Sequence, residues 1–106
     1  MKDRARMAGS VLLVDDEANI LNALRRELHS WAAERAIGIE TAASAQEALA
    51  FLGERPGEVS VIVSDLKMPG MLGSDFLLEV RERWPDITTI LLTGFSETEQ
   101  VMKAVK

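Results

Sequence analysis

The sequence VLLVDD at residues 11–16 joins a continuous apolar run to two adjacent carboxylates. Two more apolar runs follow, at residues 59–63 (VSVIV) and at residues 88–92 (TTILL). Strands that are apolar on both faces are typical of a parallel sheet that helices cover on each side. A fourth and weaker strand is expected at residues 37–41, where alternating polarity and a glycine favour the edge of the sheet.

Amphipathic helices are expected between these strands, the first over residues 17–34. The second is expected to begin at Ser44, because residues 44–47 (SAQE) match a capping box, and the last is expected to begin at Ser96 for the same reason. The apolar positions of the first and third helices are Ile20, Leu21, Leu24, Leu28 and Trp31, and Phe76, Leu77, Val80 and Trp84. Strict alternation of strands and helices predicts an α/β protein with an open, doubly wound parallel sheet.

The composition excludes several classes of protein. The chain has 106 residues, the size of one domain, and a formal net charge of −5 at pH 7. It contains no cysteine, which excludes a disulfide scaffold, a cysteine-ligated zinc or iron–sulfur site and thiol catalysis, and which suits a reducing compartment. Three of the 12 basic residues but one of the 17 acidic residues lie in the first ten positions, so the rest of the chain is acidic. This balance argues against binding to the phosphate backbone of nucleic acids.

Residues 1–9 are expected to form a flexible leader ahead of a single domain at residues 10–106. The apolar run at residues 11–14 is too short for the core of a signal peptide or for a membrane span. We therefore expect a cytoplasmic protein that has no membrane segment.

Polar residues follow three of the expected strands at their carboxyl ends. Asp15 and Asp16 follow the first strand, Asp65 follows the third and Thr93 follows the fourth. The carboxyl ends of the strands line the binding crevice in open α/β sheets, so we expect these side chains to converge. Two carboxylates about 4 Å apart repel by about 4 kcal/mol at an effective dielectric constant near 20, and a hard cation such as Mg²⁺ removes that cost. Asp15 and Asp16 could instead cap the following helix, but capping does not explain Asp65.

A turn is expected directly after Asp65. Proline and then glycine at Pro69 and Gly70 favour a type II turn, and Met68 is pushed toward an extended conformation because it precedes proline. This turn would hold Asp65 and the backbone carbonyl of Lys67 near the crevice. The alternative is an ordinary surface turn, since Pro-Gly turns are common.

Taken together, residues 11–17 (VLLVDDE), 64–70 (SDLKMPG) and 91–94 (LLTG) resemble the receiver domain of bacterial two-component response regulators. The resemblance covers residues 10–106 and implies a flavodoxin-like sheet with strand order 2-1-3-4. It also implies a signalling module rather than an enzyme, limited to self-catalysed phosphoryl transfer and dephosphorylation. A sensor histidine kinase or a phosphotransfer protein would be the phosphoryl donor, and an output domain or protein of unknown identity would respond.

The resemblance assigns a role to each candidate residue. Asp65 matches the phosphoacceptor, Asp16 the direct ligand of Mg²⁺ and Asp15 the acid that binds the ion through water. The backbone carbonyl of Lys67 would complete the protein ligands. Thr93 matches the hydroxyl that bonds a phosphoryl oxygen after phosphorylation.

The sequence departs from the family pattern after Thr93. Receiver domains continue into a fifth strand, whose lysine pairs with the phosphate, and a fifth helix, whereas Lys103 and Lys106 fall on the last expected helix. The domain is therefore expected to be incomplete at its C-terminus. An alternative function follows, a pseudo-receiver or interaction fragment that keeps the fold without being phosphorylated. A glycine-rich phosphate loop, which a cofactor-binding domain of similar fold would need, does not follow the first strand.

Without a fifth strand, residues 88–92 would form an apolar and uncharged edge of the sheet. An edge of this kind is a template for pairing with another chain. We therefore expect a homo-oligomer that forms through this edge or through exchange of the terminal helix.

Overall fold

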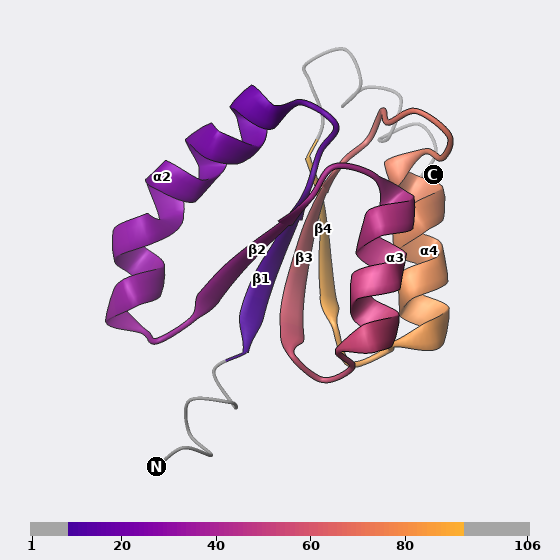
Figure 1. Ribbon diagram of the computed structural model, residues 1–106. Helices are drawn as coiled ribbons and strands as arrows, with labels where there is room; N and C mark the ends of the chain where they lie inside the picture. The colour runs from indigo at the N-terminus through magenta and orange to yellow at the C-terminus, as the bar shows by residue number, and fades with distance from the viewer. Residues whose placement is uncertain (1–8, 93–106) are drawn as a thin grey trace, which may run out of the picture.

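A computed structural model describes residues 9–92 of the chain (Figure 1). The elements, in chain order, are β1 (Ser10–Val14), α2 (Ala18–Glu34), β2 (Gly38–Ala42), α3 (Ala45–Glu54), β3 (Val59–Asp65), α4 (Gly73–Arg83) and β4 (Thr88–Leu92). Residues 1–8 of the leader expected at residues 1–9, the residue Thr93 and the expected helix from Ser96 lie outside the described residues.

The four strands form one parallel sheet in the order β2-β1-β3-β4. Helix α2 lies on one face of this sheet, and α3 and α4 lie together on the other (Figure 1). The predicted doubly wound α/β fold and its strand order are confirmed, and β2 occupies the edge expected from its weak pattern. Gly9 accepts a hydrogen bond from Gly38 at 3.2 Å, so the last residue of the expected leader is already bonded to the sheet.

The core on the α3 and α4 face is the larger of two apolar clusters. Its most enclosed side chains come from the sheet and from both helices; they include Leu12, Leu52, Ile62, Phe76 and Val80, each almost fully buried. Met68, from the loop after β3, belongs to the same cluster. The loop that follows Asp65 is thus anchored in the main core.

Helix α2 packs over β1 and β2 with a narrower apolar face than the sequence predicts. Leu21 is buried and Leu24 and Leu28 are partly buried, but Ile20 is 41% exposed and Trp31 is 42% exposed. Within residues 9–92, the main strand contacts of α2 are with β1 and β2, and these two side chains are not covered by them. Ile20 and Trp31 thus belong to the predicted apolar stripe of this helix but are the exposed part of it.

The helix ends follow local rules. At the start of α3, the hydroxyl of Ser44 accepts a hydrogen bond from the Glu47 amide at 3.1 Å, which confirms the predicted cap. Helix α2 ends in a Schellman motif, in which the amide of Ile37 donates to the carbonyl of Ala32 and Ala36 has a positive φ of 56°.

Of the helices in the described part of the chain, none is both long enough and apolar enough to cross a membrane.

Candidate metal centre

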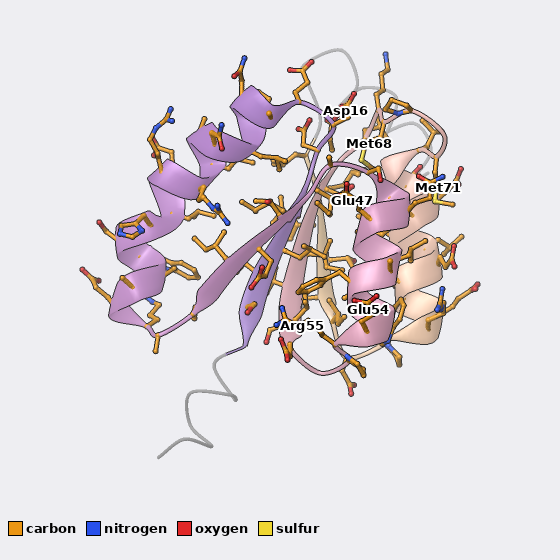
Figure 2. All side chains as sticks on the ribbon, viewed as in Figure 1. Asp16, Glu47, Glu54, Arg55, Met68 and Met71 are labelled. Carbon is orange, nitrogen blue, oxygen red and sulfur yellow. The ribbon has the colours of Figure 1, made fainter. Side chains whose placement is uncertain are left out.

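Strand register brings the candidate residues to one edge of the sheet. Val14, at the end of β1, lies opposite Ala42 in β2 and opposite Ser64 in β3. The residues that follow Val14 therefore lie beside the last residue of β3, Asp65. Figure 2 shows Asp16 at this end of the sheet, and Met68 of the loop after β3 lies at the same end.

Three carboxylates converge there, as predicted. Asp15, Asp16 and Asp65 each offer a carboxylate oxygen that lies within 4.8 Å of the other two. Asp15 is buried, Asp65 is half-buried and Asp16 is exposed, so the cluster opens to solvent on one side. At such distances the carboxylates repel one another. A hard divalent cation with oxygen ligands would offset that repulsion, and this donor set fits Mg²⁺.

Asp15 is held in place by two backbone contacts. Its amide donates to the carbonyl of Ala42 at 3.2 Å, and its Oδ1 accepts from the amide of Glu17 at 2.9 Å. The bond to Glu17 fixes the orientation of this carboxylate. Asp15 is also buried, with an exposed fraction of 7%, so contacts within the protein determine the position of its side chain.

The alternative explanation for the two adjacent aspartates, helix capping, fails. The residue at the N-cap of α2 is Glu17, and its side chain makes no capping hydrogen bond. The side chain of Asp15 accepts a hydrogen bond from the amide of Glu17, which is the N-cap residue itself and precedes the first turn of α2. Asp16 thus remains available to the acidic cluster, in which its carboxylate lies.

The loop between β3 and α4 carries the predicted turn. Gly70 has a φ of 88°, as a type II turn requires at its third position. Leu66 and Met68 are buried on either side of Lys67, whose side chain is exposed. The backbone at Lys67 is therefore anchored from both sides, directly after Asp65.

Two residues that the sequence analysis did not single out touch the backbone of Asp65. The hydroxyl of Ser64 donates to the carbonyl oxygen of Asp65 at 2.9 Å. Gly73, the first residue of α4, lies against the same carbonyl group. The feature of the sequence that could have identified Gly73 is a glycine at the start of a helix, where no turn requires a glycine. Thr93, predicted to complete the site, lies outside the described residues, although Leu92 before it is the register partner of Asp65.

Comparison with known proteins agrees with this geometry. The family model of the response regulator receiver domain matches residues 11–106. The hydrogenase transcriptional regulatory protein HoxA of Cupriavidus necator is 44% identical over 96 residues, which cover 91% of this chain but 18% of HoxA. This chain thus spans less than a fifth of the length of that relative.

Solved structures show the same likeness. A response regulator receiver domain protein from Clostridium thermocellum has a TM-score of 0.78 at 29% identity, covering 92% of this chain and 74% of that chain. The response regulator TrrA of Thermotoga maritima, solved in complex with Mg²⁺ and BeF, has a TM-score of 0.72 at 34% identity, covering 84% of this chain and 72% of that one.

Receiver domains are signalling switches, generally not enzymes; they bind Mg²⁺ at an acidic pocket and interact with histidine kinases and output domains. Three observations on this chain agree with a receiver domain: the acidic cluster, the order of the strands in the sheet and the family match over residues 11–106. This chain therefore belongs to the receiver domain family of response regulators.

Proposed function

We propose that this chain accepts a phosphoryl group on the carboxylate of Asp65 in the presence of Mg²⁺. The observation that carries the proposal is the convergence of three carboxylates within 4.8 Å at the carboxyl end of the sheet. Asp16, exposed at the mouth of the cluster, would bind the ion directly, and the buried Asp15 would bind it through water. The backbone carbonyl of Lys67 would complete the protein ligands.

The chemistry is a transfer from phosphohistidine to carboxylate. An Asp65 oxygen attacks phosphorus, the P–N bond breaks, and its electron pair stays on the imidazole nitrogen as the P–O bond of an acyl phosphate forms. Mg²⁺, when bound, neutralises charge on the transferring oxygens. Asp65 is half-buried at a strand end, so its carboxylate is held in place and still accessible to a donor. Thr93 would then bond a phosphoryl oxygen with its hydroxyl.

The donor would be a sensor histidine kinase or a phosphotransfer protein, in a cytoplasmic setting. HoxA is described as a transcriptional regulatory protein, and this chain spans 18% of it, so the output partner of this chain stays open. The alternative of a receiver fold that signals without phosphate is not favoured, because the three carboxylates are assembled.

We also infer that two copies of the chain associate through β4. Within residues 9–92, β4 pairs with β3 on one side and with no strand on the other. Thr88–Leu92 carries no charge, and Ile90 is 44% exposed. An uncharged apolar edge of this kind favours pairing with another strand. Exchange of the terminal helix, the other route expected, involves residues outside those described.

Magnesium titration during thermal unfolding tests the site. A Mg²⁺ concentration ten times its Kd should stabilise the folded chain by about 1.4 kcal/mol. Asp16→Asn should raise the metal-free Tm, because it removes one repelling charge, and should abolish the Mg²⁺ increment. Asp86→Asn is the matched control, since Asp86 is exposed between α4 and β4 and lies outside the acidic cluster. An unchanged melting curve of the unsubstituted chain at millimolar Mg²⁺ would show that the proposed metal site is wrong.

Mass spectrometry tests the phosphoacceptor. Incubation with acetyl phosphate and Mg²⁺ should add one phosphoryl group, and peptide mapping should place it on Asp65. Asp65→Asn should lose the adduct and Asp86→Asn should keep it. An adduct on another residue would contradict the assignment.

A further inference from the structure

Ser64 is a fully buried polar residue whose side chain forms a hydrogen bond to the residue that follows it. It precedes Asp65 in β3, and its exposed fraction is 0%. Its hydroxyl donates to the backbone carbonyl oxygen of Asp65 at 2.9 Å. A buried hydroxyl needs a partner, so this bond is retained as long as Ser64 stays in the core.

Gly73 lies close to the same carbonyl group. It is buried at the start of α4, and its amide donates to the carbonyl of Leu66 at 2.6 Å. A methyl group placed on Gly73 would overlap the carbonyl oxygen of Asp65 and lie 2.9 Å from its carbonyl carbon. It would also lie 3.1 Å from Cα of Leu66. Helix α4 therefore starts in direct contact with the end of β3, and only glycine permits that approach.

The peptide group between Asp65 and Leu66 thus has two close neighbours. The Ser64 hydroxyl bonds to the Asp65 carbonyl oxygen, and the backbone of Gly73 lies against the same carbonyl group. Rotation of this peptide would break the bond to Ser64. The same peptide links the Cα of Asp65, which carries the carboxylate, to the loop that carries Lys67.

We propose that Ser64 and Gly73 are positioning residues that hold the Asp65 carboxylate and the Lys67 carbonyl where the metal site needs them. The inference rests on the proposed function, because it assumes that this acidic cluster binds Mg²⁺. A purely structural role for the two residues would change the stability of the fold and leave metal affinity unchanged. A positioning role changes metal affinity in protein that is still folded.

The test compares two variants with two controls. Ser64→Ala removes the hydroxyl without adding atoms, and Gly73→Ala introduces the overlap with the Asp65 carbonyl. Gly53→Ala is the control for the glycine, because a methyl group on Gly53 meets nothing within 4 Å. Ser60→Ala is the control for the serine, because Ser60 lies in the same strand and is exposed.

Isothermal titration with MgCl₂ gives the affinity, and circular dichroism in the same buffer shows that each variant is folded. Groups that orient the ligands of a metal typically change its affinity by about 10- to 100-fold when they are removed. We expect Ser64→Ala to weaken Mg²⁺ binding by about tenfold and Gly73→Ala by more, toward the upper end of that range. Gly53→Ala and Ser60→Ala should keep the affinity of the unsubstituted chain.

The outcomes separate this inference from the proposed function. If the unsubstituted chain binds Mg²⁺ and both folded variants bind it within twofold of the same Kd, the positioning role is refuted and the metal site stands. If the unsubstituted chain does not bind Mg²⁺, the proposed function is refuted and this inference with it. If Gly73→Ala does not fold, Ser64→Ala decides, because it adds no atoms to the core.

Discussion

The two faces of the sheet are made from similar strands but are packed very differently. On the face that carries α3 and α4, the strand side chains Leu12, Val14 and Ile62 are almost fully enclosed. On the face that carries α2, Val11 and Leu13 are enclosed, but Val61 and Val63 in the neighbouring strand are only partly buried. Farther along this face, Leu92 is 41% exposed.

This difference shows that strand sequence alone does not decide burial. An apolar residue in a parallel strand is buried only where a helix lies over it, and within residues 9–92 α2 packs over β1 and β2. The acidic site lies at the carboxyl end of the sheet, and Met68 anchors the loop of this site in the α3 and α4 core.

Removing a large side chain from the α3 and α4 face should have the largest effect. Phe76→Ala should lower the free energy of unfolding by about 3–5 kcal/mol, because Phe76 is fully buried and its removal leaves a cavity. Urea denaturation followed by circular dichroism measures the loss. A loss below about 1 kcal/mol would mean that this face is not the main core.

The side-chain cap of α3 should contribute more to the free energy of unfolding than the residue at the N-cap of α2. Ser44→Ala should cost about 1 kcal/mol, since it removes the hydroxyl that accepts from the Glu47 amide. Glu17→Ala is the matched control at the N-cap of α2, where no side-chain capping bond exists. Equal losses for the two variants in urea denaturation would contradict a capping role specific to Ser44.

The C-terminal end of α2 should gain stability from a glycine. Ala36 has a φ of 56°, which an L-residue adopts at a cost of about 1–2 kcal/mol, and glycine removes that cost but adds about 0.5–1 kcal/mol of chain entropy. Ala36→Gly should therefore raise the free energy of unfolding by about 0.5 kcal/mol. Ala33→Gly, inside the last turn of α2, should lower it by about 0.5–1 kcal/mol. Opposite signs are the expected result, and two losses would show that Ala36 is not strained.

The open part of the α2 face should tolerate substitution with little effect on stability. Ile90→Lys should change the free energy of unfolding by no more than about 0.5 kcal/mol, because its side chain is exposed. The same substitution should shift sedimentation toward monomer, since a lysine on an edge strand opposes pairing. Leu78→Lys, exposed on α4, should leave the sedimentation profile unchanged. An unsubstituted chain that sediments as an 11.7 kDa monomer at tens of micromolar would refute association through β4.

The sequence by itself determined the strands, their parallel arrangement and the meeting point of Asp15, Asp16 and Asp65. It did so because apolar runs mark buried strands, and parallel strands put their carboxyl ends at the same edge. The cap at Ser44 was also readable, since a capping box depends on residues only a few positions apart.

Only the tertiary structure decided which apolar residues are covered, and which backbone groups touch at the site. Ile20 and Trp31 fit the helical pattern but are exposed, because burial depends on which strands lie beneath α2. The contacts of Ser64 and Gly73 with the Asp65 carbonyl depend on how closely α4 approaches β3. That approach is a distance between two packed elements, and no local pattern of residue types encodes it.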